Sequence, residues 1–120
     1  MSTLTSTLDT TALSTAIESR DADGIVAWYE KDAIMTVLDR DHPPAAPAVY
    51  RGIDAIAAYY RDVCGRNIQH RVSDVVATPE GLAFTQQCKY PDGVGVLCAT
   101  VAQTHGGKIR RQTAVQVWDA

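Results

Sequence analysis

The chain has 120 residues, with 11 basic and 14 acidic side chains, so its formal net charge is −3. This length predicts one domain spanning residues 1–120, and a hydrophobic fraction of 46 % is enough for a folded core. The acidic balance argues against a general nucleic-acid binder, which needs clustered positive charge, and against a polybasic membrane anchor.

The first ten residues, MSTLTSTLDT, have neither a basic start nor an apolar run, so they do not resemble a signal peptide. No stretch approaches the length of a membrane span. The three cysteines have no metal-like spacing and fit free thiols in a reducing compartment. We therefore expect a cytoplasmic protein whose Ser/Thr-rich residues 1–8 are flexible.

The first half of the chain favours helices. Asp9, Thr10 or Thr11 can cap a first helix, and Asp21 with Asp23 can begin a second. The predicted elements are a helix to about residue 20, a short helix after Asp21, a strand over 33–39, a loop with three prolines over 40–48, and an amphipathic helix over 53–64.

The second half favours strands separated by turns. Pro at the second position and Gly at the fourth indicate type I turns at 78–81 and 90–93, and Gly106-Gly107 suits a two-residue hairpin. The sequence thus predicts a four-stranded antiparallel meander over about 68–78, 82–90, 94–104 and 108–118.

Turn geometry fixes which residues share a face of the meander. With a glycine bulge in the first turn, His70 pairs with Tyr90 and Asp74 with Gln86. The same reasoning pairs Cys88 with Val96, Gln86 with Cys98 and Phe84 with Thr100, and then Cys98 with Val115, Thr100 with Thr113 and Ala102 with Arg111.

One face then carries most apolar residues together with a polar set. The apolar members are Val72, Val76, Leu82, Phe84, Val94, Val96, Val115 and Val117, and the polar members are His70, Asp74, Gln86, Cys88, Tyr90, Cys98, Thr100, Arg111 and Thr113. The opposite face holds Gln69, Arg71, Ser73, Thr85, Gln87, Lys89, Gln112 and Gln116, with Trp118 as a possible interface anchor.

A helix layer must cover the apolar face, and the helices supply Trp28, Tyr29 and Tyr60. An apolar cavity with a few convergent polar groups is the default ligand site. The candidate substrate-binding residues are Tyr29, Tyr60, Phe84, Gln86, Cys88, Tyr90, Cys98 and Arg111.

Three residues are candidate catalysts. Asp74 in mid-strand on an apolar face would have the raised pKa of a general base, unless it only bonds a structural neighbour. His70 near the open end of its strand is a candidate acid or base, or a rim residue bonded to Tyr90. Asp39, at the end of its strand, is a third candidate, or it is a solvated residue at the start of the following loop. Arg111 would bind an oxygen anion of the substrate, or it would form a salt bridge.

Other chemistries lack support in the sequence. Cys88 and Cys98 favour core positions, because the expected register pairs neither with a histidine. His42, His70, Asp39 and Asp41 lack the paired spacing of metal ligands, and no glycine-rich loop follows a strand. We therefore expect no metal and no cofactor.

Three segments carry a family resemblance: DADGIVAWYEKDAIMTVLD (21–39), YRGIDAIAAYYRDV (50–63) and GGKIRRQTAVQVW (106–118). With these segments in this order, the chain resembles the nuclear transport factor 2-like superfamily, and within it the small SnoaL-like and ketosteroid-isomerase-like proteins. The resemblance covers nearly the whole chain. It implies an α+β fold, a cone-shaped curved antiparallel sheet wrapped on N-terminal helices around one central pocket, and commonly a homodimer.

The resemblance to ketosteroid isomerase is partial. Tyr29 and Tyr60 fall where that family has two tyrosines of its hydrogen-bond network. The oxyanion-binding tyrosine falls near Leu13, the general-base aspartate falls at Val37 with Asp39 two residues later, and no acid matches the protonated aspartate among residues 96–99. A steroid isomerase of the familiar kind is therefore not expected.

Three functional hypotheses follow. The first is a cofactor-free isomerase, cyclase or dehydratase that acts by proton transfer on a small apolar carbonyl or polyketide-like compound. The second is a non-catalytic binder of such a compound. The third is an interaction module with a closed cavity, and in each case the outer sheet face is the expected homodimer surface.

Overall fold

The computed structural model describes residues 6–119. Its elements, in chain order, are α1 (Thr10–Glu18), α2 (Ala22–Val26), β1 (Tyr29–Leu38), β2 (Ala48–Arg51), α3 (Ile53–Cys64), β3 (Gln69–Thr78), β4 (Gly81–Lys89), β5 (Gly95–His105) and β6 (Lys108–Trp118). The predicted α+β class is confirmed. The predicted strand over 33–39 begins earlier, and the end of the proline loop contributes the short strand β2.

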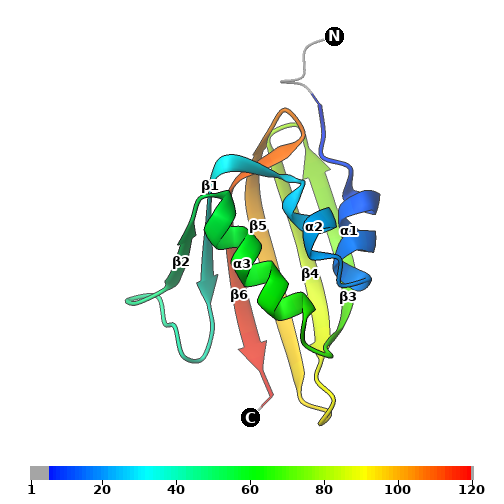
Figure 1. Ribbon diagram of the computed structural model, residues 1–120, viewed down its shortest axis with the longest axis vertical. Coiled ribbons are helices and arrows are strands. Elements are labelled where there is room, and N and C mark those ends of the chain that lie inside the picture. Colours follow the sequence, from blue (N-terminus) through cyan, green and yellow to red (C-terminus); the bar gives the residue numbers. More distant parts are fainter. Residues whose placement is uncertain (1–5, 120) are drawn as a thin grey trace.

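The strands form one six-stranded sheet in the order β2-β1-β6-β5-β4-β3. The sheet curves, and the three helices lie against one of its faces (Figure 1). The meander β3–β6 is antiparallel as predicted, whereas β1 joins β6 in parallel, so the complete sheet is mixed. Because β1 inserts beside the last strand, it closes the core at the side away from β3.

Local chemistry sets the helix starts. The carboxylate of Asp9 accepts a 3.0 Å hydrogen bond from the amide of Ala12, and that of Asp21 accepts a 3.1 Å bond from Gly24. Each bond satisfies an amide that has no partner within its own helix. The predicted cap at Asp9 is confirmed.

The core lies between the helices and the inner face of the sheet. Met35, Ile56 and Ile109 are its largest fully buried side chains, from β1, α3 and β6 respectively. The segment expected to be flexible falls largely on residues 1–5, which lie outside the described residues. Leu8, at its end, is only 2 % exposed and packs in the core.

The register between β4 and β5 is as predicted. Gln86 pairs with Cys98 and Cys88 with Val96. The turn between the strands closes through the Tyr90 amide on the Val94 carbonyl at 3.0 Å, with Gly93 at φ 92°. A positive φ at this position is the reason that the turn requires glycine.

The register between β3 and β4 corrects the prediction. Thr78 pairs with Gly81, so the turn has two residues rather than three, and a β-bulge lies between Ser73 and Val76. Asp74 sits in this bulge with φ 55°. The predicted pairing of Asp74 with Gln86 is wrong, because Val72 takes that place and His70 pairs with Cys88 instead of Tyr90.

The bulge also reverses the faces beyond it. Ala77 pairs with the buried Leu82, whereas Val76 pairs with Ala83 and is 64 % exposed. Val76 therefore belongs to the outer face, contrary to the prediction. A bulge inserts one unpaired residue and so shifts the alternation of side chains by one.

A second bulge corrects β6. Thr104 pairs with Ile109 but Gln103 pairs with Arg111, so Arg110 is the additional residue. The predicted faces are consequently reversed along the rest of the strand. Gln112, Ala114, Gln116 and Trp118 belong to the inner face, and Arg111, Thr113, Val115 and Val117 to the outer face.

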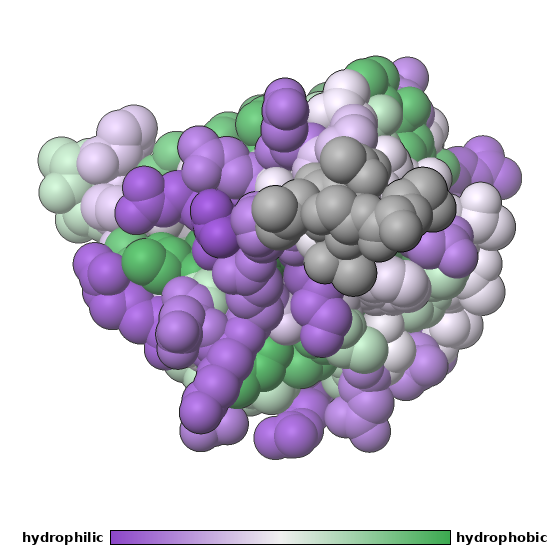
Figure 2. Space-filling view, turned by 90° about the horizontal axis from the view of Figure 1, so that it is seen from above, coloured by the Kyte–Doolittle hydropathy of each residue, from purple (hydrophilic) through white to green (hydrophobic). Residues whose placement is uncertain are grey.

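The two ends of the molecule differ. The turn at 90–94 and the end of β6 lie at one end, and the β3–β4 and β5–β6 turns lie at the other (Figure 1). Seen from the latter end, hydrophilic side chains form much of the visible surface, with apolar patches between them (Figure 2). Among residues 6–119, no helix is long and apolar enough to cross a membrane.

Candidate functional site

A cavity of about 100 Å³ lies between α3 and the inner face of the sheet. Its walls are largely apolar and aromatic, with polar groups at a few points. The polar and thiol-bearing lining residues are Tyr59, Tyr60, Cys64, Arg66, His70, Gln86, Cys88, Tyr90, Cys98, Thr100, Gln112, Gln116 and Trp118. Ligand pockets usually hold about 300–1,000 Å³, so the enclosed part of this one suits a small group.

A ring of three polar side chains forms one wall. The hydroxyl oxygens of Tyr29 and Tyr60 are 2.6 Å apart, and the Tyr29 hydroxyl donates to Oε1 of Gln112 at 2.7 Å. Nε2 of Gln112 lies 3.5 Å from the Tyr60 hydroxyl. Tyr60 and Gln112 line the cavity, and Tyr29 supports them from behind.

Burial raises the pKa of both Tyr29 and Tyr60 above the ordinary value for tyrosine. The charge of a Tyr60 phenolate would add to this effect on the pKa of Tyr29. Both hydroxyls therefore keep their protons at neutral pH. Because the single proton of the Tyr29 hydroxyl goes to Gln112, the Tyr60 hydroxyl donates to Tyr29, and it faces the cavity as a neutral hydroxyl, not as a base.

His70 and Cys88 form a second polar group, on β3 and β4. Nδ1 of His70 is 3.2 Å from Sγ of Cys88, and both residues line the cavity. Burial lowers the pKa of His70, and the nearby charge of Arg20 acts in the same direction. The imidazole is therefore neutral at pH 7 and available as a proton acceptor.

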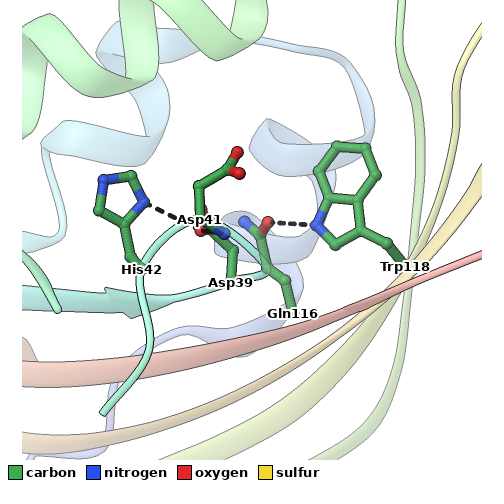
Figure 3. A network of polar contacts seen from close by, with 5 residues as sticks. All are labelled: Asp39, Asp41, His42, Gln116 and Trp118. Atoms are coloured by element: carbon green, nitrogen blue, oxygen red, sulfur yellow. Dashed lines mark hydrogen bonds and ion pairs between the residues drawn. The ribbon is translucent and has the colours of Figure 1, made fainter. Parts of the chain in front are cut away.

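Asp39 lies at the edge of the cavity, where β1 ends. Leu38 pairs with Val115 in the parallel ladder, which brings Asp39 beside the cavity-lining Gln116 (Figure 3). Its carboxylate accepts hydrogen bonds of 2.9 Å from His42 and from the amide of Asp41. Burial opposes ionisation, but these bonds and the charge of His42 outweigh it and lower the pKa of Asp39.

An aromatic pair lines the part of the cavity near the end of β6. The rings of Tyr90 and Trp118 are 5.3 Å apart, and the guanidinium of Arg40 lies 4.3 Å from the Trp118 ring. The Trp118 indole donates a 3.1 Å hydrogen bond to Gln116 (Figure 3). A ligand beside these residues would meet flat aromatic surfaces, with the cation of Arg40 over the Trp118 ring.

The structure brings together most of the residues predicted for the site. Tyr60, Phe84, Gln86, Cys88, Tyr90, Cys98 and His70 line the cavity, Tyr29 supports its wall, and Asp39 lies at its edge. Asp74 does not join them. It is exposed on the outer face, where it accepts a 2.7 Å hydrogen bond from Thr85. Arg111 is also exposed on the outer face.

Three cavity residues, Gln112, Gln116 and Trp118, were predicted to lie on the opposite face. The valines at 115 and 117 favoured the wrong alternation, because apolar side chains usually turn inward. The same segment also permits the opposite alternation, in which the tryptophan and the uncharged amides turn inward and Arg111 turns outward. No glycine marks the bulge that decides between the two.

A metal centre has no ligand cluster in the described part of the chain. Nowhere within residues 6–119 do three or more His, Cys, Asp or Glu side chains gather in a geometry that could hold a metal ion. The histidines and carboxylates considered in the sequence instead form separate pairs, Asp39 with His42 and His70 with Cys88.

The curved sheet, the helix layer and the cavity between them define an α+β small-molecule-pocket fold. The profile of the SnoaL-like domain matches residues 10–112. The chain therefore belongs to the SnoaL-like family, within the nuclear transport factor 2-like superfamily. None of the curated proteins matches the chain.

Solved structures share the fold at low sequence identity. A nuclear transport factor 2-like protein of unknown function from Mesorhizobium loti superposes with a TM-score of 0.76 at 10 % identity, over 92 % of this chain and 88 % of that chain. A provisionally assigned ketosteroid isomerase from Kribbella flavida gives 0.72 at 13 % identity, over 92 % and 75 %. A SnoaL-like protein of unknown function from Burkholderia thailandensis gives 0.65 at 15 %, over 92 % and 90 %.

Proposed function

We propose that this protein is a cofactor-independent enzyme that moves a proton on a small, largely apolar carbonyl compound. The reaction class is isomerisation, aldol-type cyclisation or dehydration. One observation carries the proposal: a neutral imidazole and a protonated phenol, His70 and Tyr60, both line one apolar cavity. General acid–base chemistry requires these two kinds of group in one water-poor space.

His70 is the proposed base. Its lowered pKa leaves the imidazole uncharged at neutral pH, so it can accept a proton from the carbon next to a carbonyl group. Its position opposite Cys88, on the wall of the cavity, supports this role.

Tyr60 is the proposed partner for the carbonyl oxygen. When a proton leaves the neighbouring carbon, negative charge develops on that oxygen, and the Tyr60 hydroxyl stabilises it by turning its proton from Tyr29 to the oxygen. Tyr29 and Gln112 hold Tyr60 in place through the ring of hydrogen bonds described above. Gln86 is placed to orient the substrate, because it also lines the cavity.

Asp39 is the alternative base. Its position at the end of β1 favours this role, because the resemblance to ketosteroid isomerase places a base close to this point. Its lowered pKa and its two hydrogen bonds make it the weaker acceptor of the two. Asp74 and Arg111 have no part in the proposal, since they lie on the outer face.

The proposal is tested by carbon-bound hydrogen exchange. The protein is incubated in D₂O with a panel of small apolar ketones, and deuterium uptake next to the carbonyl is followed by NMR. We expect catalysed uptake that falls by about 10²-fold in His70→Gln, the usual effect of removing a general base. Tyr60→Phe should reduce it as well, through the loss of the oxygen's partner.

Matched variants sharpen this test. Asp74→Asn changes a carboxylate on the outer face and should leave the exchange unchanged. A loss in Asp39→Asn with normal activity in His70→Gln would transfer the role of base to Asp39. Tight ketone binding without any exchange would instead support the non-catalytic binder, and neither binding nor exchange would support the closed interaction module.

We further propose that the protein forms a homodimer through the outer face of the sheet. Leu97, Val101, Val115 and Val117 are exposed there on the adjacent strands β5 and β6. Leu97 pairs with Val117, and Ala99 with Val115, so these side chains form a continuous apolar stripe. An exposed stripe of this kind favours association with a matching surface.

A further inference from the structure

All three cysteines of the chain, Cys64, Cys88 and Cys98, line the same cavity. Cys88 differs from the other two in its neighbour. Its Sγ lies 3.2 Å from Nδ1 of His70, within hydrogen-bond distance. The sequence alone did not indicate this pair, because the expected register set His70 opposite Tyr90; the shorter turn and the bulge at Asp74 bring the two together.

We propose that Cys88 is a nucleophile that adds to α,β-unsaturated carbonyl compounds held in the cavity, with His70 accepting the thiol proton. The cavity's apolar walls suit the body of such a compound. This inference shares its cavity and His70 with the proposed function, but it assigns a covalent step and a narrower class of ligand.

The step is balanced without an external oxidant or reductant. The sulfur of Cys88 forms a bond to the β-carbon while its proton passes to Nδ1 of His70. The electron pair of the carbon–carbon double bond moves toward the carbonyl oxygen and gives an enolate. The imidazolium then returns the proton to the α-carbon, which restores the carbonyl group, and the reverse sequence releases the compound.

The other two thiols lack this arrangement. Cys98 is buried, and its sulfur lies 3.9 Å from the hydroxyl of Thr100. Cys64 lies on α3, and within residues 6–119 it has no hydrogen bond to an imidazole. Cys64 and Cys98 are therefore internal references for a thiol in this cavity without a base.

The charge state of the pair decides how it can react. Burial raises the pKa of the Cys88 thiol to about 11, with a smaller contribution from Cys98. Burial lowers the pKa of His70. The pair is therefore a neutral thiol beside a neutral imidazole, so attack requires His70 to take the proton as the sulfur–carbon bond forms.

N-ethylmaleimide is a suitable probe, because it is itself an α,β-unsaturated carbonyl compound. The double variant Cys64→Ala/Cys98→Ala keeps only Cys88, and Cys64→Ala/Cys88→Ala keeps only Cys98. The rate of adduct formation is followed by intact-protein mass spectrometry from pH 5 to 9, with and without His70→Gln. Far-UV circular dichroism checks that each variant is folded.

The pH profile gives the decisive result. With His70 present, the rate at Cys88 should rise as the imidazole loses its proton and then stay level through neutral pH. In His70→Gln it should fall by about 10²-fold at pH 7 and rise about tenfold for each pH unit, as expected for an unassisted thiol. The rate at Cys98 should not respond to His70→Gln.

A steady rise with pH in the unmodified protein, or equal rates with and without His70, would overturn the proposal. The unmodified chain provides the first of these readouts by peptide mapping, so the test holds even if a variant does not fold. Deuterium uptake in Cys88→Ala separates the two proposals. Uptake that persists there while the fast, His70-dependent part of adduct formation is lost assigns the covalent step to Cys88 and proton transfer to His70 alone.

Discussion

The hydroxyl of Tyr29, the first residue of β1, donates a 2.7 Å hydrogen bond to the side chain of Gln112 in β6. Both residues are buried, and they lie on two strands that pair in parallel, with Tyr29 opposite Ile109 and Gln112 opposite Met35. Because the Tyr29 hydroxyl is buried and Gln112 lines the cavity, the bond links the stability of the core to the shape of the cavity wall.

Replacement of Gln112 should therefore destabilise the protein. Gln112→Leu leaves the buried Tyr29 hydroxyl without its acceptor, and we expect a loss of about 1–3 kcal/mol in the free energy of unfolding. Urea denaturation measures this loss. Gln103→Leu, an exposed glutamine on the outer face of β5, is the matched control and should change the value by less than about 0.5 kcal/mol. Equal effects would contradict the role of the buried bond.

The stability of the protein should depend on pH through His70. Burial lowers the pKa of His70 in the folded state, so the unfolded chain, in which the histidine has a pKa of about 6.5, binds the proton more readily. The contribution of His70 is complete above that value and is lost as the pH falls below it. Urea midpoints from pH 7.5 to 5 should decline, and the decline should be smaller in His70→Gln. An unchanged slope would refute this assignment.

Asp39 should act in a more acidic range. Its pKa is lowered in the folded state by the bonds from His42 and Asp41, so its contribution is complete above about pH 4 and is lost as the pH falls further. Thermal unfolding between pH 5 and 3 should show a smaller decline for Asp39→Asn, which keeps the size of the side chain but does not titrate. Asp74→Asn serves as the control, and an equal decline in the two variants would argue against the Asp39–His42 pair.

The homodimer should depend on the stripe on β5 and β6. Val101 is 64 % exposed on the outer face, and Val101→Lys would bury a charge in the proposed interface. Light scattering after size-exclusion chromatography should give a dimer for the unmodified chain and a monomer for this variant. Val49→Lys introduces the same charge on the edge strand β2 and should remain a dimer. Dissociation by Val49→Lys alone would move the interface to that edge.

The fold could be predicted from the sequence because its signals are local and consistent with one another. The cap at Asp9, the proline loop and the Tyr90-Pro91-Asp92-Gly93 turn each specify their own geometry. The register of β4 against β5 follows from that last turn alone, and it correctly placed Gln86, Cys88 and Cys98 on the cavity wall.

The site was harder to predict because it depends on two bulges. Neither Asp74 nor Arg110 belongs to a residue type that marks a bulge in a sequence, and each shifts the alternation of a whole strand segment. Asp74 was therefore predicted to face the cavity but lies on the outer face. Trp118 was predicted to lie on the outer face but lines the cavity. In its observed register β6 also pairs with β1, and the two strands are far apart in the sequence.

The extra residue at Arg110 makes strand register, as well as side-chain identity, a determinant of what the cavity can accept. A slip of β6 by one position against β5, with the bulge closed and no residue lost, would turn Val115 and Val117 toward the ligand and move Gln112, Gln116 and Trp118 to the outer face. Deletion of Arg110 would instead remove the bulge and keep Gln103 opposite Arg111, so the cavity wall would stay as it is. The β5–β6 hairpin can therefore lose one residue without any change in the polar groups that a ligand meets.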